Sequence, residues 1–465
     1  MNQNIDILIN DDLKQQLSVE FANFYKIVPK SATKDLLTLY ISETSYSDGL
    51  QEELEMLLDK KVSFQTVSLQ SVLKALSKYY RKANADISFQ SDNDFLESVI
   101  SEAKSIGSSD IHFEIYKDFA RIRIRIDGVL IERFRIDKND YKELVNKVKI
   151  KANLDISEKR LPQDGRIHFQ DFDIRTSILP TLYGEKIVLR ILGKGVADLS
   201  LDSLGFEQNE QKYYEEAIKK ENGIILISGP TGSGKTTTLY ATLKMLNDIK
   251  RNIVTVEDPI EYTLDGINQV HLREDIGLTF SSALRSFLRQ DPDVIMLGEI
   301  RDAETAQMAI RASLTGHLVL STIHTNSAIG TISRLVDMGV PAFLIAETLN
   351  ASVAQRLVRK LCNHCKIEVP LDKERLPSNY QMPYHIETVS ESVGCEHCYY
   401  TGYSGRLAIF EVLPIDSELI NQIKSNRNEI NQNNIKYRTL SDKAFDLVAK
   451  KDTSLEEVYS ILLGQ

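Results

Sequence analysis

The sequence lacks any run of about 18 uninterrupted apolar residues, so we expect no segment of it to span a membrane. Residues 1–6 also lack a basic stretch followed by an apolar run, so no signal peptide is visible. Basic residues are in the minority, with 56 Lys and Arg against 66 Asp and Glu and a formal net charge of −10. This balance argues against bulk nucleic-acid binding, although it leaves room for a local basic channel. Together these absences predict a cytoplasmic protein.

Cysteine is scarce, and each of the four cysteines falls in one of two Cys-x-x-Cys pairs, Cys362/Cys365 and Cys395/Cys398. Disulfides are not expected in a reducing cytoplasm. A thioredoxin-type redox site would need only one such pair, and four free buried thiols would be a coincidence. Two pairs around a loop of about 29 residues match a four-thiolate zinc clip, which is closed and structural by its ligand count. Two nearby residues are spare ligands: His364 and His397.

A chain of 465 residues is too long for one hydrophobic core, and its length favours about three domains. Residues 1–84 carry short helical patterns of mixed charge, which predict a small α-rich domain, and they contain no catalytic constellation. The simplest interpretation of this part is a docking or spacer module. Polar residues 85–98 are predicted to form a linker to the next domain.

Residues 99–195 predict an α+β domain with an unusual density of arginines. The segment Arg121–Ile126 alternates strictly, so one face of a strand is apolar and the other is basic. Asp127-Gly128 is a hairpin-turn signal. A single arginine is most simply part of a solvated sheet face, whereas together the arginines would supply a positive wall for a phosphate bound elsewhere. They are Arg121, Arg123, Arg125, Arg160, Arg166, Arg175 and Arg190.

Within residues 196–355, an apolar strand pattern breaks into a glycine-rich turn, and a helix pattern starts at Lys235. The turn fills the template G-x-x-x-x-G-K-[ST] of a phosphate-binding loop, whose backbone N–H groups attract phosphate. Lys235 is expected to reach the β- and γ-phosphates and the Thr236 hydroxyl to ligate Mg²⁺. The pattern predicts binding of a nucleoside triphosphate. The residues expected to contact it are Gly229, Pro230, Thr231, Gly232, Ser233, Gly234, Lys235, Thr236 and Thr237.

Apolar strands alternate with helices through the same region, which is typical of a parallel sheet with crossover helices. Ligands bind at the carboxyl ends of the strands in such folds, and Glu257, Glu299 and His324 follow three of the strands. Hydrolysis needs one carboxylate to orient or deprotonate water and one to hold Mg²⁺ directly or through water. Glu299 and Glu257 are the candidates, with Glu257 the choice for the metal. The expected strands are Ile224–Ile227, Ile253–Val256, Val294–Leu297 and Leu318–Thr322.

Three further side chains allow more than one interpretation. His324 either senses the γ-phosphate or bridges to a neighbouring subunit, unless it is a structural histidine. Arg285 and Arg289 lie four residues apart, so a helix would place them on one face. They are either a solvated pair or an arginine finger that reaches a phosphate across a subunit boundary.

From residue 356 to residue 465 helical patterns dominate outside the cysteine pairs, and we expect a C-terminal helical region that carries the zinc clip.

Motifs spread over most of residues 100–415 form a recognisable set. Besides the phosphate loop and the cysteine pairs they are Ser109–His112, Arg125–Gly128, Arg160–Arg166, Gly184–Arg190, Val256–Tyr262, Arg289–Asp293, Gly298–Asp302, Ser321–Asn326 and Gly402–Arg406. The set resembles the assembly ATPases of type II secretion and type IV pili (GspE/PilB). By this resemblance Glu299 stands at the family's catalytic glutamate. Arg175 and Arg190, with Arg285 and Arg289, stand where the family places phosphate-facing or interdomain arginines.

The resemblance implies an α/β fold with four parts. A RecA-like P-loop ATPase core follows an arginine-rich α+β (PAS-like) domain and a small α-rich docking domain, and precedes the helical region with the zinc clip. The enzyme would be a ring-shaped homo-hexamer that hydrolyses ATP with Mg²⁺ and holds a structural Zn²⁺. Residues 1–84 would dock on a cytoplasmic segment of an inner-membrane recruiting protein, and the motor would push a polytopic inner-membrane platform protein. The retraction motors of the family lack the docking domain and the clip, so an assembly motor is expected.

Two other classes of protein use the same nucleotide core. An ATP-driven nucleic-acid translocase would have basic pore loops and DNA-stimulated hydrolysis, and the acidic balance of this chain leads us to expect no nucleic-acid partner. A nucleotide-gated scaffold that does not hydrolyse ATP should lack Glu299 or Lys235, and both are present. The sequence leaves open whether the motor serves secretion or pilus assembly.

Overall fold

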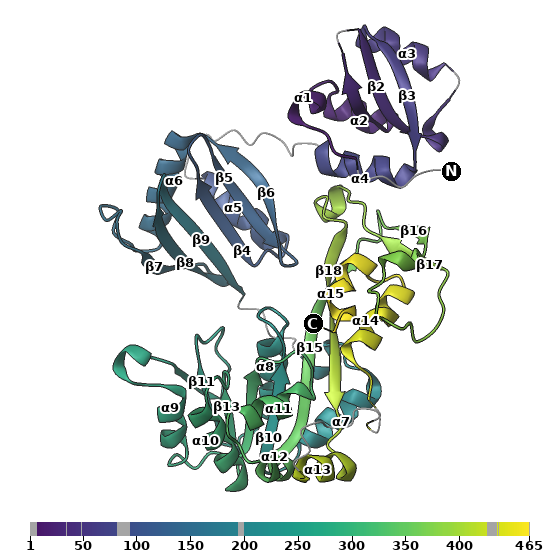
Figure 1. The fold of residues 1–465 in the computed structure, drawn as a ribbon. Helices are drawn as coiled ribbons and strands as arrows, with labels where there is room; N and C mark the ends of the chain where they lie inside the picture. Colours follow the sequence, from purple (N-terminus) through teal and green to yellow (C-terminus); the bar gives the residue numbers. More distant parts are fainter. Residues whose placement is uncertain are drawn as a thin grey trace.

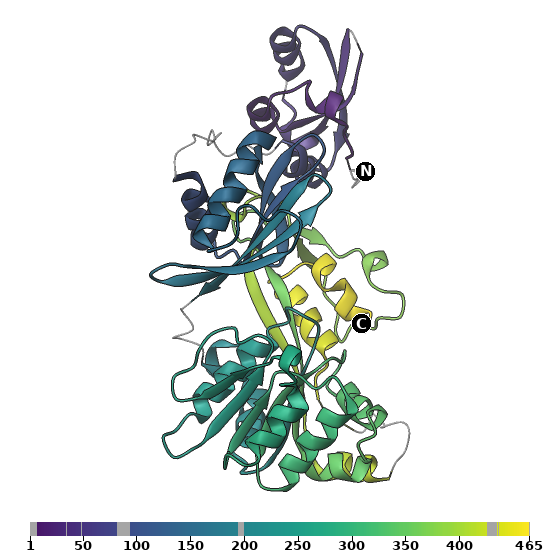
Figure 2. The ribbon, with the colours of Figure 1, turned by 90° about the vertical axis from the view of Figure 1, so that its left-hand side faces the viewer.

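The computed structural model describes residues 7–33, 35–47, 49–80, 94–193, 200–425, 435 and 437–464. These residues form four β-sheets of three, six, seven and two strands, with helices packed on them. The N-terminal domain lies at one end of an elongated molecule and the seven-stranded sheet at the other, with the six-stranded sheet between them (Figures 1 and 2). In the described residues no helix combines the length and the apolar character that crossing a bilayer requires.

The N-terminal domain is a mixed α/β unit, so the expectation of an α-rich domain is wrong in omitting a sheet. Strand β2 pairs antiparallel with β1 and parallel with β3. Alternate residues of β2, from Leu37 to Ile41, are fully buried. The strands are only six or seven residues long and lie between amphipathic helices, whose periodicity dominates the sequence. The elements are α1 (Asp11–Lys14), α2 (Val19–Tyr25), β1 (Ile27–Ala32), β2 (Leu36–Ser42), α3 (Leu50–Leu58), β3 (Lys61–Val67) and α4 (Leu69–Tyr79).

The second domain is a six-stranded antiparallel sheet in the order β6-β5-β4-β9-β8-β7. Its first helix begins at Asp94, so the predicted linker 85–98 extends too far: Phe95 and Leu96 are already buried in the core. Residues 85–93 lie outside the described part of the chain. Asp127 and Gly128 both have positive φ, 48° and 86°, as the expected hairpin turn requires. The elements are α5 (Asp94–Ser105), β4 (Asp110–Ile115), β5 (Ala120–Ile126), β6 (Val129–Ile136), α6 (Lys138–Lys151), β7 (Gln163–His168), β8 (Phe172–Thr181) and β9 (Gly184–Gly193).

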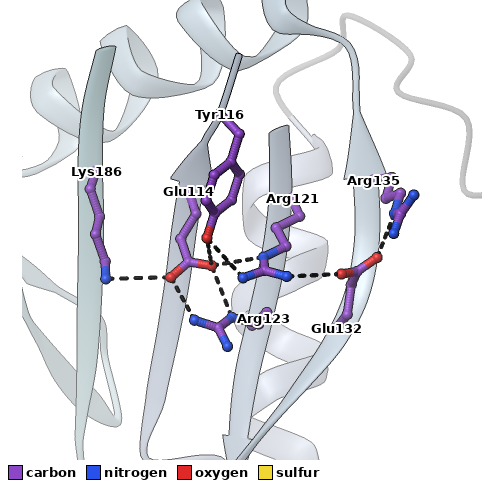
Figure 3. A network of polar contacts seen from close by, with 7 residues as sticks. All are labelled: Glu114, Tyr116, Arg121, Arg123, Glu132, Arg135 and Lys186. Atoms are coloured by element: carbon purple, nitrogen blue, oxygen red, sulfur yellow. Dashed lines mark hydrogen bonds and ion pairs between the residues drawn. The ribbon is translucent and has the colours of Figure 1, made fainter. Parts of the chain in front are cut away.

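The apolar and basic faces of this sheet separate as the sequence predicts. The isoleucines of β5 pack with α5 and α6 in one hydrophobic cluster. The opposite face carries a network around Glu114, whose carboxylate binds Arg121 (2.9 Å), Arg123 (2.7 Å) and Lys186 (3.3 Å) (Figure 3). Burial would raise the pKa of Glu114, but the two arginines outweigh burial and lower the pKa to about 2. These arginines are therefore structural.

The seven-stranded sheet has the order β12-β11-β13-β14-β10-β15-β18, parallel except for β18. Helices cover both of its faces: α7 and α8 pack in one cluster, and α9 to α12 in the other. All four expected strands are present as β10, β11, β13 and β14. The elements are α7 (Gln208–Ile218), β10 (Gly223–Ser228), α8 (Lys235–Leu246), β11 (Ile253–Glu257), β12 (Asn268–His271), α9 (Phe280–Phe287), β13 (Val294–Leu297), α10 (Ala303–Leu314), β14 (Leu318–Ile323), α11 (Gly330–Asp337) and α12 (Ala342–Thr348).

The expected C-terminal helical region from residue 356 is wrong at its start, because two long strands complete the central sheet there. Strand β15 pairs parallel with β10 on one side and antiparallel with β18 on the other. Its residues are almost all buried on both faces, so they show no alternation, and its two adjacent polar residues Gln355 and Arg356 interrupt the apolar run. The elements are β15 (Leu349–Leu361), β16 (Ile367–Pro370), β17 (Thr388–Glu391), β18 (Tyr403–Leu413), α13 (Ser417–Lys424), α14 (Leu440–Ala449) and α15 (Leu455–Leu462).

The Glu114 network predicts a pH-dependent stability. Replacing Glu114→Gln removes the negative charge that two buried arginine contacts need, and should destabilise the six-stranded domain by roughly 3 kcal/mol at neutral pH. Because the pKa of Glu114 is lowered in the folded state, its contribution is complete above the unfolded value of about 4.3 and is lost as the pH falls toward about 2. Urea unfolding of the full chain, with hydrogen exchange in β4 to β9 as the probe, measures the difference in the free energy of unfolding between the variant and the unaltered protein.

The matched control is Glu143→Gln, which removes only an exposed helix pair with Lys147. It should leave the stability of the domain nearly unchanged. A Glu114→Gln loss that equals the control, or one that persists undiminished near pH 2.5, would contradict this account of the network.

Candidate functional site

The phosphate loop joins β10 to α8 at the carboxyl edge of the central sheet. Gly229 has φ of 148°, and a Cβ there would stand 2.5 Å from the Gln355 carbonyl oxygen and 2.6 Å from the Ser233 hydroxyl. Gly234 has φ of 89° and begins α8 as its N-cap. Both glycines of the template are thus required by the backbone, one by close approach and both by conformation. The loop leaves Thr231, Gly232 and Thr236 exposed.

Lys235 lies across the loop that it follows. Its ammonium group donates to the carbonyl oxygens of Gly229 (2.8 Å) and Pro230 (2.9 Å). Burial lowers the pKa of Lys235, the carboxylate of Glu299 opposes that effect, and the charge of Arg356 adds to it. The lysine therefore lies within the electrostatic reach of a strand-end carboxylate, as the sequence predicts.

Glu299 and His324 come together at the ends of two neighbouring strands, β13 and β14. The Nε2 atom of His324 lies 3.3 Å from one carboxylate oxygen of Glu299, and Arg301 pairs with the other oxygen at 2.5 Å. The Oε2 atom of Glu299 faces His324 Nε2 outside hydrogen-bond geometry, and the hydroxyls of Ser228 and Ser233 beside the phosphate loop are buried without a hydrogen-bond partner in the described residues. Unpartnered buried polar atoms of this kind fit a site that is completed by a bound ligand.

Glu257 ends β11 as expected, but its side chain is enclosed. Its carboxylate accepts hydrogen bonds from the hydroxyl of Tyr240, from Thr255 (2.6 Å) and from Gln269 (3.1 Å), and only 3% of the residue is exposed. Burial first, and then Glu257, raise the pKa of Tyr240. Among the described residues no hydrogen bond or ion pair joins Glu257 to Glu299, His324 or the phosphate loop. Its role at a metal stays a prediction.

Arg285 and Arg289 are exposed, and the chain holds them away from the phosphate loop. Arg285 of α9 forms an ion pair with Glu304 of α10. Arg289 donates to the carbonyl oxygen of Arg285 at 2.8 Å and so caps the end of α9. Within the described residues neither arginine bonds to the phosphate loop. A contact across a subunit boundary stays a prediction.

Arg175 and Arg190 belong to a row of five charged residues that lie opposite one another across five strands of the six-stranded sheet. The row shares one carboxylate, because Asp110 binds Arg190 (2.9 Å) and Arg125 (3.4 Å) while the last two arginines of the row are exposed. The pKa of Arg190 is raised by its hydrogen bond to Asp110 and, further, by the charge of Glu261 in the core. Arg190 of this basic row therefore lies within electrostatic reach of the loop that follows β11. Its members are Arg125, Asp110, Arg190, Arg175 and Arg166.

Gln355 and Arg356 of β15 also line the phosphate loop, and the sequence analysis missed them. Gln355 accepts a hydrogen bond from Thr238 of α8 at 2.8 Å. The Arg356 guanidinium lies 3.2 Å from the point where a Cβ on Gly229 would stand. The adjacent polar residues Gln355 and Arg356 in a buried segment were the available signal. The sequence analysis predicts a helical region from residue 356, so it assigns no strand whose polar residues could line the loop.

The four cysteines converge. Sγ–Sγ distances are 3.9 Å for Cys362 and Cys395, 3.8 Å for Cys365 and Cys398, and 3.8 Å for Cys395 and Cys398, and all four sulfurs lie within 4.8 Å of one another. Four thiolates about 2.3 Å from a tetrahedral ion would be about 3.8 Å apart. Backbone N–H groups of Gly394, Cys395 and Gly402 donate to these sulfurs, which favours thiolates. His364 and His397 stack on each other at 4.1 Å. The donor set fits zinc.

Comparison with known proteins agrees with this geometry. A family model described as "Type II/IV secretion system protein" matches residues 88–460. The putative type II secretion system protein E of Escherichia coli (strain K12) is 46% identical over 377 residues, which cover 79% of this chain and 76% of that protein. The type IV pilus assembly ATPase PilB of Myxococcus xanthus (strain DK1622) is 49% identical over 324 residues, which cover 68% of this chain and 57% of PilB.

Two solved structures share the fold. The pilus retraction motor PilT with bound ADP aligns with a TM-score of 0.54 and 27% identity, over 79% of this chain and 97% of PilT. The ATPase DotB of Legionella pneumophila aligns with a TM-score of 0.60 and 22% identity, over 80% of this chain and 96% of DotB, which shows a common fold alone. The expectation of an α/β protein related to secretion ATPases is confirmed.

Proposed function

The chain belongs to the Type II/IV secretion system protein family and is an ATPase, and from that premise we propose that it hydrolyses ATP to power assembly of a pseudopilus or pilus at the inner membrane. The carrying observation is that the phosphate loop, Lys235, Glu299 and His324 converge at one edge of the central sheet. None of the relatives named above is a nucleic-acid translocase. The alternative of a DNA or RNA motor therefore has no support.

Each residue of the site has a role in this proposal. The phosphate loop, from Gly229 to Thr237, binds the triphosphate, and Thr236 would hold Mg²⁺, which screens phosphate charge. Lys235 neutralises the β- and γ-phosphates. Glu299 orients the attacking water and accepts its proton. His324 reports the γ-phosphate through its contact with Glu299. Glu257, which accepts a hydrogen bond from Tyr240, would support the metal through a bridging water.

For the larger assembly we propose the homo-hexameric ring that the family resemblance implies. In a homo-hexameric ring, Arg285 and Arg289 would reach the nucleotide of a neighbouring subunit. Arg175 and Arg190 would close on it from the arginine-rich, PAS-like domain onto the RecA-like core. We divide the chain into residues 1–84 for docking, 85–98 as linker, 99–195 as the arginine-rich domain, 196–355 as the core and 356–465 as the C-terminal region. Docking on a recruiting inner-membrane protein would attach the motor to the membrane beside its platform protein.

The assignment of Glu299 predicts a variant that binds ATP but does not cleave it. Replacing Glu299→Gln keeps the size of the side chain and removes its basicity, so turnover should fall by about 100-fold or more. Binding of a fluorescent ATP analogue should change by less than about threefold, since Lys235 and the loop are unaltered. Phosphate release and equilibrium titration of the full chain measure the two quantities.

The control is Glu347→Gln on α12, where the exposed carboxylate pairs only with Lys424. It should leave turnover as in the unaltered protein. If Glu299→Gln hydrolyses ATP at the rate of this control, Glu299 is not the base. If the unaltered chain, assembled as hexamer, neither binds nor hydrolyses ATP, the proposed function itself is wrong.

We also propose that Cys362, Cys365, Cys395 and Cys398 hold a structural Zn²⁺. Bound there, the ion would fix the ends of the insert that carries β16 and β17. The full chain, purified without added metal, should contain about one equivalent of zinc per chain. Cys365→Ser should lose the metal and unfold at a lower temperature.

The matched comparison is His364→Ala, one residue away. Its imidazole stacks on His397 and is not in the sulfur cluster, so zinc content should stay near one equivalent. Elemental analysis that finds less than about half an equivalent in the unaltered chain, or zinc lost from His364→Ala and kept in Cys365→Ser, would refute the four-thiolate site.

A further inference from the structure

The loop that follows His324 is held by three buried side chains. Arg356 donates from Nη2 to the carbonyl oxygen of Asn326 at 3.0 Å. Ser352 donates to the carbonyl oxygen of Ala328 at 2.7 Å. Glu411 accepts from the N–H of Ala328 at 2.7 Å. The main chain between β14 and α11 is therefore held at Asn326 and Ala328, shortly after His324, the histidine that contacts Glu299.

The three side chains lie on one face of the strand pair β15–β18. Ser352 and Arg356 are four residues apart in β15, and Glu411 stands opposite Ala354, which lies midway between them. Arg356 and Glu411 are thus diagonal neighbours on the same face. The exposed fractions are 0% for Ser352, 7% for Arg356 and 3% for Glu411. The β15–β18 pair therefore places three polar side chains against the loop within a hydrophobic layer.

Burying two opposite charges here has a free-energy cost. Burial lowers the pKa of Arg356 and the charge of Glu411 opposes that shift. Burial raises the pKa of Glu411, and the N–H groups of Leu440 and Ala328 and the charge of Arg356 oppose that shift. Apolar residues of similar volume often stabilise a core as well as or better than two buried opposite charges. The pair therefore requires an explanation other than stability, and fixing one arrangement of the loop supplies one.

Arg356 also lies beside the phosphate loop, with Nη1 3.2 Å from the point where a Cβ on Gly229 would stand. Its Nη1 atom donates to the carbonyl oxygen of Gln355 at 3.0 Å, and that oxygen is the atom against which Gly229 packs. One planar guanidinium therefore spans the distance between the first glycine of the phosphate loop and the loop that follows His324. A lysine has one nitrogen and cannot reproduce this planar fork.

We propose that Arg356 is a positioning residue for ATP hydrolysis: it sets the spacing between the phosphate loop and His324, with Glu411 as its buried counter-charge. The inference rests on the proposed function and adds a residue to it. Arg356 is not expected to touch nucleotide, because it is buried and its Nη1 and Nη2 atoms donate to main-chain carbonyl oxygens. Its effect reaches the reaction through His324 and the contact of His324 with Glu299.

The test is a double-mutant cycle in the full chain. Arg356→Lys keeps the charge and loses one of two carbonyl bonds, so kcat should fall about tenfold or more while KM for ATP changes less than about threefold. In a His324→Ala background the same change should cost less than about twofold, because the residue through which it acts is already gone. Hydrogen exchange of residues 325–330 should rise in Arg356→Lys.

The control is Arg359→Lys on the same strand. Arg359 binds Glu457 of α15 (2.9 Å) and lies over the ring of Tyr403, so its replacement should leave kcat within about twofold. If Arg356→Lys does not fold, Ser352→Ala removes a bond to the same loop without leaving a buried charge unpaired. It should then show the lower kcat, unchanged KM and coupling to His324→Ala.

The outcomes separate the two proposals. An unaltered chain that fails to hydrolyse ATP overturns the proposed function. If the unaltered chain is active, three results would each contradict the role of Arg356 and leave the proposed function standing. These are a kcat of Arg356→Lys equal to that of Arg359→Lys, effects of Arg356→Lys and His324→Ala that multiply independently, and full activity of His324→Ala.

Discussion

The packing of the phosphate loop between its neighbouring strands is the constraint on which the rest of the site depends. Strand β10 lies between β14 and β15, all three parallel, so their carboxyl ends meet at one edge. The loop that leaves β10 must therefore pass against the middle of β15, and glycine is the only residue type that fits at position 229 beside the Gln355 carbonyl oxygen. The same strand order brings Glu299 from β13 and His324 from β14 into contact. Strand order, more than any single side chain, assembles the chemistry.

Buried charge recurs in this molecule, and at Glu114, Glu257 and Glu411 it is satisfied by partners from neighbouring segments. Glu114 is held by two arginines and a lysine of adjacent strands, and Glu257 by hydroxyl and amide donors. Glu411 is held by two backbone N–H groups, one from the loop after His324 and one from the start of α14. Charges of this kind stabilise little on balance, but a misplaced partner is costly, so they select one arrangement of the segments they join. The loops of the catalytic edge are the segments so joined.

The arginine-rich domain and the cysteine cluster meet through a small polar contact. Asp127, at the tip of the β5–β6 hairpin, accepts a hydrogen bond from the N–H of Gly405 at 2.8 Å, and Arg406 lies 3.6 Å from the same carboxylate. Beside it Tyr399, just after the last cysteine, packs against the hydrophobic cluster of the arginine-rich domain. An insert organised by a metal would thus offer a defined surface to the domain that carries the basic row. Contacts this small suit a domain that shifts during a motor cycle.

The sequence alone determined whatever is encoded by local spacing. Glycine and lysine positions fixed the phosphate loop, strict alternation fixed β5 with its two faces, and the isolated cysteine pairs fixed their own convergence. The sequence did not determine β15 and β18, because β15 is buried on both faces and β18 changes from exposed to fully buried along its length, so neither strand shows a regular alternation. Tertiary structure decided which arginines are structural, as Arg121 and Arg123 are bound to Glu114 whereas Arg175 is exposed. It also enclosed Glu257 between side chains 12 and 17 residues away in the chain, and it placed Arg356 of β15 beside Gly229 of the phosphate loop, and no local pattern records such neighbours.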